Sequence, residues 1–263
     1  MYRISPIVKN LLIINVLLFI ATFAIGTQSN IDLTKYLALY YPGSDFFRPY
    51  QYVTYMFMHG GMAHIFFNMY ALWLFGTAIE NSWGGKRFLF YYLFTGIGAA
   101  VLHTLVNYLI YSGMASEIVA FQNTPSPESF RQFVEAHKEH FNQNVYDFIH
   151  QWSISPGNTG YAATALENMH RIYQTAINIP TVGASGAVFG ILLAFGMMYP
   201  NTQLMLLIPP MPIKAKWLVI GYGAIELFLA FSQPGSNIAH FAHLGGMLFG
   251  FILIRYWMVQ SRR

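Results

Sequence analysis

The chain has 263 residues and a formal net charge of +4; 55% of its residues are hydrophobic and 9% are charged. Soluble domains carry about 25% charged residues, so this composition excludes an ordinary soluble domain and indicates a membrane protein. The basic residues are scattered rather than gathered in a stripe, so nucleic acid is not an expected partner. The absence of cysteine excludes disulfides, thiol chemistry and thiolate metal sites.

Apolar runs predict an all-α, polytopic membrane protein with a bundle of six spanning helices. A spanning helix needs about 20 mostly apolar residues. The predicted spans cover residues 11–25, 64–79, 88–111, 185–199, 217–231 and 240–259. The first run ends without a small-x-small cleavage site, so we interpret it as a retained anchor rather than a signal peptide. We expect the whole chain, 1–263, to form one membrane domain.

The segment 112–180 differs from the spans because it is polar and contains Pro125, Pro127 and Pro156. Its one helix-like run extends from Glu128 to Trp152 and is partly amphipathic. We expect an insertion between the third and fourth spans, on the outer side of the membrane. A partly ordered surface insertion is the simplest interpretation; a small cap domain, a substrate-contacting lid and a flexible loop are alternatives.

The basic residues predict the orientation of the chain. With six spans, the rich clusters all fall on one face: Arg3, Lys9, Lys86, Arg87, Lys214, Lys216, Arg255, Arg262 and Arg263. The positive-inside rule makes this face cytoplasmic, so both termini are expected inside. A bacterial cytoplasmic membrane is the expected location.

Four polar residues lie at the outer ends of the even-numbered spans. His64 and Asn68 open the second span and, four residues apart, share one helix face. Ser185 opens the fourth span, and His243 lies one turn inside the sixth. Polar groups at membrane depth are costly and usually face a cavity or a partner, so this convergence predicts a functional site.

The chemistry that such a set permits is acyl transfer. Histidine suits the task of taking the proton of a serine hydroxyl near neutral pH, so Ser185 and His243 are the candidate nucleophile and base. Asn68, His64 and the free amides at the start of a helix are candidate donors to an oxyanion. No obvious Asp or Glu is available to orient the base, which favours a dyad over a triad.

Small residues on the fourth and sixth spans support a close approach of these two helices. Gly186 and Gly190, and likewise Gly246 and Gly250, form small-xxx-small patterns. Such patterns allow helix backbones to approach closely in lipid. Packing alone would also explain them.

At these residues the sequence resembles the rhomboid family of intramembrane serine proteases. Residues 183–186 match the family's GxSG motif, residues 242–250 match AHxxGxxxG, and residues 59–68 match HxxxxHxxxN. The resemblance implies a Ser185–His243 dyad, with His64 and Asn68 as oxyanion donors and Phe189 stacked on the base, where the family often has tyrosine. Phe47 also departs from the family, which often has tryptophan before the arginine in the first outer loop.

The activity implied by the resemblance is hydrolysis of peptide bonds in or near transmembrane helices. The expected partners are single-span or multi-span membrane protein substrates and the lipid bilayer, with no cofactor and no metal. Substrates are expected to enter past the fifth span and the loop 232–239.

Two other classes of function remain as alternatives. A catalytically silent rhomboid-like protein would bind membrane clients, although intact Ser185 and His243 argue against it. A transporter or channel would use the histidines to relay protons or bind a metal, and would give Ser185 no special role. We interpret His240 as a structural or outer-mouth residue. We interpret Glu226 as a packing or gate hydrogen-bonding residue and assign it no catalytic role.

Overall fold

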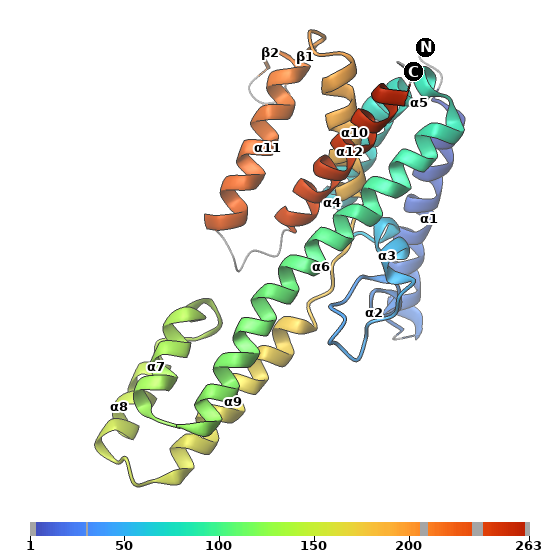
Figure 1. Ribbon diagram of the computed structural model, residues 1–263. Helices are drawn as coiled ribbons and strands as arrows, with labels where there is room; N and C mark the ends of the chain where they lie inside the picture. The colour runs from blue at the N-terminus through green and yellow to red at the C-terminus, as the bar shows by residue number, and fades with distance from the viewer. Residues whose placement is uncertain (1–3, 30, 206–209, 233–238, 261–263) are drawn as a thin grey trace. The chain divides into compact units, whose positions relative to one another are not determined.

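The computed structural model describes residues 4–29, 31–205, 210–232 and 239–260, and these divide into two compact units. Unit 1 comprises residues 1–40, 46–105 and 180–263, and unit 2 comprises residues 41–45 and 106–179. The described chain is mainly helical and contains one two-stranded antiparallel ribbon (Figure 1). The predicted all-α class is therefore confirmed.

Unit 1 contains the long apolar helices. Its elements are α1 (Pro6–Ser29), α2 (Leu33–Leu37), α3 (Gln51–Thr54), η1 (Tyr55–Phe57), α4 (Met62–Ala71), η2 (Leu72–Gly76), α5 (Thr77–Trp83), the first part of α6 (Gly85–Asn123), α10 (Ser185–Met198), β1 (Gln203–Met205), β2 (Pro212–Lys214), α11 (Ala215–Ser232) and α12 (His240–Gln260). Among the described residues, five stretches are long and apolar enough to cross a membrane: Pro6–Thr27, Met62–Trp83, Gly85–Asn123, Ala215–Ser232 and His240–Gln260. The chain is thus an integral multi-pass membrane protein.

Two of the predicted spans differ in form from an ordinary spanning helix. The fourth, α10, has 14 residues, fewer than the roughly 20 that a full crossing requires. The second is continuous from α4 to α5 but passes through η2, a π-helical turn. Such π-turns occur most often at functional sites.

Helices α10 and α12 pack side by side with their backbones in contact. A Cβ built at Gly246 would lie 1.8 Å from the carbonyl oxygen of Gly186, and one at Gly250 would lie 3.4 Å from Cα of Gly190. No side chain fits between the two helices at Gly246. The small-residue pattern therefore has a direct steric reason here.

Buried polar side chains fix the parts of unit 1 that support these helices. Glu80 accepts hydrogen bonds from Ser5 Oγ and from the backbone N–H groups of Ile7 and Val8, so it caps the start of α1. Gln51 is fully buried and makes four hydrogen bonds to backbone groups of α2 and of the segment that follows it. These bonds hold the segment that leads into η1.

Unit 2 is a separate helical cluster that contains residues 112–179 of the expected insertion. Its elements are the rest of α6, α7 (Pro127–Ala136), η3 (Lys138–His140), α8 (Asn144–Ile154) and α9 (Thr159–Ile177). The third span was expected to end at Tyr111, but α6 continues to Asn123 because Met114, Ile118 and Phe121 repeat at helical spacing and pack into the core of unit 2.

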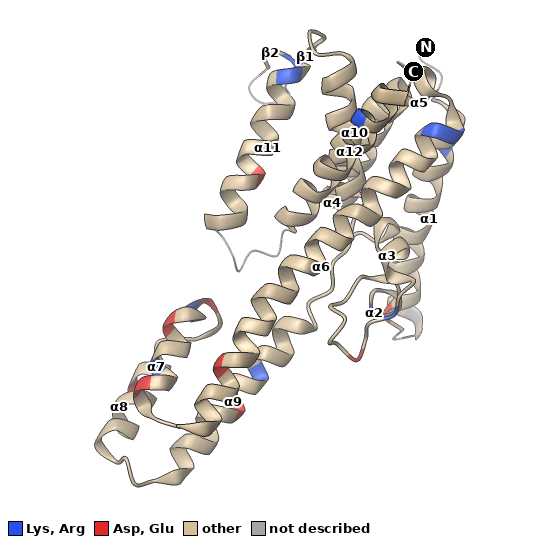
Figure 2. Ribbon diagram, viewed as in Figure 1, with Lys and Arg blue, Asp and Glu red and all other residues tan. Residues whose placement is uncertain are grey.

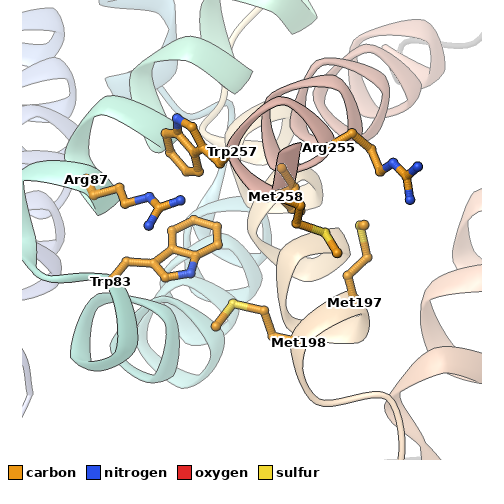
Figure 3. A pocket seen from close by; sticks show the side chains of 8 residues that line it. Trp83, Arg87, Met197, Met198, Arg255, Trp257 and Met258 are labelled. Atoms are coloured by element: carbon orange, nitrogen blue, oxygen red, sulfur yellow. The ribbon is translucent and has the colours of Figure 1, made fainter. Parts of the chain in front are cut away.

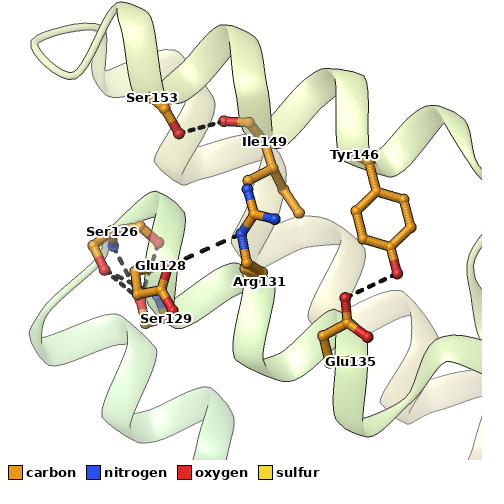
Figure 4. Close-up of polar contacts among 8 residues, drawn as sticks. All are labelled: Ser126, Glu128, Ser129, Arg131, Glu135, Tyr146, Ile149 and Ser153. Atoms are coloured by element: carbon orange, nitrogen blue, oxygen red, sulfur yellow. Dashed lines mark hydrogen bonds and ion pairs between the residues drawn. The ribbon is translucent and has the colours of Figure 1, made fainter.

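The helix-like run expected over residues 128–152 is not one continuous helix. It is divided into α7 and α8, with η3 between them. Ser126 begins α7 with a reciprocal capping pair to Ser129 (Figure 4). Phe130, Phe133 and Trp152 then bury their rings in the same core, which gives the polar segment enough apolar contact to fold.

The two ends of unit 1 differ in charge, and the basic end contains a cavity. Lysine and arginine gather at the end where α1 begins and α12 ends (Figure 2). At this end a cavity of about 480 Å³ is lined by Trp83, Arg87, Met197, Met198, Ile254, Arg255, Trp257 and Met258 (Figure 3). The guanidinium of Arg87 lies 5.6 Å from the ring centre of Trp83 and 4.1 Å from that of Trp257. Ser185 and His243 both lie at the other end of unit 1, in the first turns of α10 and α12.

Candidate active site

Ser185 is placed by a strained turn at the start of α10. Gly183 has a φ of +127°, a conformation that favours glycine. A Cβ at Gly183 would also lie 2.7 Å from Nε2 of His64 and 3.6 Å from Oγ of Ser185. The backbone N–H of Gly183 donates to the carbonyl of Tyr55, 2.9 Å away, which anchors the turn to η1. Glycine is therefore required for both conformation and space.

His243 faces Ser185 from the first turn of α12. Its Nε2 is 2.8 Å from Ser185 Oγ, within hydrogen-bond distance. On α10, one turn beyond Ser185, the ring of Phe189 stacks on the imidazole with centroids 4.3 Å apart and planes inclined by 7°. His243 is buried, so its ring is held between the serine and the phenyl face.

A carboxylate lies beside His243, and here the structure differs from the expectation that the base has none. Oε2 of Glu226, on α11, is 3.0 Å from Nδ1 of His243 and 2.7 Å from Nδ1 of His240. The first distance is that of an ion pair, although Nδ1 of His243 lacks an aligned hydrogen-bond partner among the described residues. His240, expected to be structural, is thus joined to the same carboxylate. These three groups could also hold a metal ion.

His64 points its Nε2 toward the serine turn. Its other nitrogen, Nδ1, accepts a hydrogen bond from the backbone N–H of Gly60 at 3.4 Å. A neutral imidazole that accepts at Nδ1 carries its proton on Nε2. The atom that faces Gly183 and Ser185 is therefore a donor.

Asn68 is buried on the same face of α4, but its amide Nδ2 donates to the carbonyl of His64 at 2.9 Å. No contact between Asn68 and Ser185 is observed among the described residues. A second amide hydrogen remains on Nδ2. The structure therefore brings His64 to the serine turn and leaves Asn68 one turn further along the helix.

Two further histidines surround the site. Nε2 of His103, on α6, is 3.0 Å from Oγ1 of Thr181 in the segment before α10. Sequence reasoning missed His103, and the available signal was an ionisable side chain inside an apolar span. His59 packs edge-on against His64 with ring centroids 5.1 Å apart. Burial, with a smaller contribution from His64, lowers the pKa of His59 to about 4.

Fold and site together define a class: a multi-pass membrane protein that holds a serine and a histidine in contact at the starts of two tightly packed helices. Comparison with known proteins matches the Rhomboid domain family over residues 47–123 and 148–260. The match covers most of the chain and begins after α1, and the chain belongs to the rhomboid family.

Two curated relatives align with shorter segments. "Rhomboid protease GluP" of Bacillus subtilis (strain 168) is 45% identical over 49 residues, which cover 19% of this chain and 10% of that protein. "Rhomboid-like protein 11, chloroplastic" of Arabidopsis thaliana is 39% identical over 57 residues, which cover 22% of this chain and 20% of that protein. The aligned segments thus span a small part of each relative.

Proposed function

We propose that this chain is an intramembrane serine endopeptidase that hydrolyses peptide bonds in or near transmembrane helices of membrane proteins. The observation that carries the proposal is the 2.8 Å separation of Ser185 Oγ from His243 Nε2. Membership of the rhomboid family and the relative named as a rhomboid protease support it.

The proposed reaction has two steps. Ser185 Oγ attacks the scissile carbonyl carbon while His243 Nε2 takes the hydroxyl proton, and this proton then goes to the nitrogen of the departing amine. Water next attacks the acyl-serine ester, giving its proton to His243, and the serine oxygen leaves and recovers that proton. The products are a carboxylic acid and an amine, and the protein is regenerated.

The negative oxygen of each tetrahedral intermediate needs fixed donors. His64 Nε2–H lies beside the serine turn and suits this task. The first backbone amides of α10, which have no partner within the helix, are further candidate donors. Asn68 would join them only by turning its amide away from the His64 carbonyl. Loss of the His64 donor is expected to lower kcat about 100-fold, and loss of the Asn68 amide less.

The proposed orientation places both termini in the cytoplasm and the Ser185 end of the bundle toward the outer side, because the basic residues gather at the other end (Figure 2). Residues 112–180 then form an extracytoplasmic insertion. The proposed substrate path past α11 includes the loop 232–239, of which residues 233–238 lie outside the described residues. A bacterial cytoplasmic membrane is the proposed location.

The test is cleavage of a single-span reporter with a Gly/Ala-rich outer end in liposomes that contain a chelator. Wild type is compared with Ser185→Ala and His243→Ala, and the exposed Ser116→Ala and His150→Ala are matched controls. Cleavage by wild type and the controls that is lost in both site variants supports the proposal. Cleavage that persists in Ser185→Ala refutes it, and a folded wild type inactive on a panel of membrane substrates would indicate a silent client-binding protein.

A further inference from the structure

Glu226 is an unusual residue for its position. It is the only acidic residue of α11, and it is buried while its neighbours Ile225 and Leu227 are exposed on the helix surface. An ionisable group inside a spanning helix is costly and is retained where it meets a partner or performs a task. The partners of this carboxylate therefore indicate what it does.

Both partners are on α12, and one of them is the proposed base. Glu226 Oε2 is 2.7 Å from His240 Nδ1 and 3.0 Å from His243 Nδ1, while the opposite nitrogen of His243 is 2.8 Å from Ser185 Oγ. A neutral imidazole has one N–H. For Nε2 to accept the serine proton, the ring proton must be on Nδ1, the nitrogen that faces Glu226.

We propose that Glu226 is a positioning residue that keeps the proton of His243 on Nδ1 and orients the ring toward Ser185. This inference rests on the proposed function. The carboxylate stays ionised throughout: it accepts from Nδ1–H of the neutral ring and stabilises the positive charge that forms when Nε2 takes the serine proton.

His240 contributes by fixing the carboxylate. Its Nδ1–H donates to the same oxygen of Glu226 from one turn before His243, so the two imidazoles hold Oε2 between them. The stacked Phe189 restrains His243 from the side of α10. The base is thereby set by three helices: α10, α11 and α12.

The same three side chains offer a competing interpretation. Their ligand atoms lie within 4.8 Å of one another, close enough to receive a metal ion such as Zn²⁺. A metal on Nδ1 of His243 would displace the proton from that nitrogen and compete with the carboxylate for it. The ion would then oppose the role proposed for Glu226, so metal content separates the two interpretations.

The experiment compares wild type with Glu226→Gln, Glu226→Asp and His240→Gln in the liposome cleavage assay, with the exposed Glu167→Gln as the matched loss of a carboxylate. A glutamine keeps the shape of the Glu226 side chain, but its amide can donate to Nδ1 of His243 and so favour the tautomer with the proton on Nε2. We expect a fall in kcat of at least about 100-fold, with KM within about threefold of wild type. Glu226→Asp should recover part of this loss, and His240→Gln should lose about 10-fold. A kcat for Glu226→Gln within about threefold of wild type overturns the proposal.

A second readout does not depend on cleavage. In protein with ¹⁵N-labelled histidine, NMR should show a hydrogen-bonded Nδ1–H of His243 that disappears in Glu226→Gln and persists in Glu167→Gln. If wild type is inactive but this signal behaves as expected, the proposed function fails while the positioning by Glu226 stands. If the signal is unchanged in Glu226→Gln, or if purified protein holds stoichiometric zinc and a chelator raises its activity, the positioning proposal is overturned.

Discussion

Replacing Gly246 by alanine tests whether the contact between α10 and α12 sets the active-site geometry. The added Cβ would lie 1.8 Å from the Gly186 carbonyl oxygen, whereas real Cβ contacts are essentially never under 3.0 Å. The shortfall is about 1.2 Å, and it meets backbone rather than a side chain that can rotate away. The two helices must therefore separate.

The separation acts directly on the serine and the histidine. Gly186 follows Ser185, and Gly246 is one turn after His243, so the displacement is applied next to both residues. A shift of about 1.2 Å would lengthen the present 2.8 Å distance to about 4 Å, beyond hydrogen-bond range. Because a misplacement of about 1 Å can reduce a rate 100-fold, we expect Gly246→Ala to retain about 1% of wild-type kcat or less.

The stability of Gly246→Ala should also fall. Overpacking destabilises by roughly 1–3 kcal/mol, while the better helix propensity of alanine returns at most about 1 kcal/mol. The control is Gly221→Ala on α11, where a Cβ would meet nothing within 4 Å. Reporter cleavage and thermal unfolding in detergent would be measured for both. Wild-type cleavage by a folded Gly246→Ala protein would refute the argument that this contact positions the site.

Three further predictions follow from single side chains. Phe189→Tyr should keep the rate of cleavage within about threefold of wild type. Phe189→Ala removes the ring stacked on His243 and should lower kcat about 10-fold. Equal rates for the two variants would contradict the stacking role. Gln51→Ala removes the four hydrogen bonds of a buried side chain and should lower the free energy of unfolding by about 3 kcal/mol or more. The exposed Gln151→Ala should change it little, and unfolding titrations measure both. The pKa of His59 is about 4 in the folded state and 6.5 in the unfolded state. As pH decreases, the unfolded state therefore takes up a proton at a higher pH than the folded state. Stability should therefore fall as pH decreases from about 6.5 to 4, by at most about 1.4 kcal/mol per pH unit, and the profile of His59→Gln should be flatter across this window.

The sequence by itself determined the class of the protein and most of the residues that converge on the serine turn. Spanning helices are visible locally, because lipid demands long apolar runs with internally bonded backbones. Ser185, His243 and His64 stood out as polar groups at one depth. The role of the glycines of α10 and α12 in close helix packing could also be predicted from the sequence, because their spacing is a property of single helices.

Only the tertiary structure decided the partners of these residues. Glu226 and His243 are on different helices, so no spacing along the sequence relates them. A lone carboxylate in an apolar run is equally compatible with a packing role. The continuation of α6 to Asn123 depended on the core of unit 2. Met114, Ile118 and Phe121 are spaced like one helix face, but they lie among polar residues and do not form the continuous apolar run of a spanning helix. Local patterns specify which groups a helix carries, whereas packing between helices specifies what each group touches.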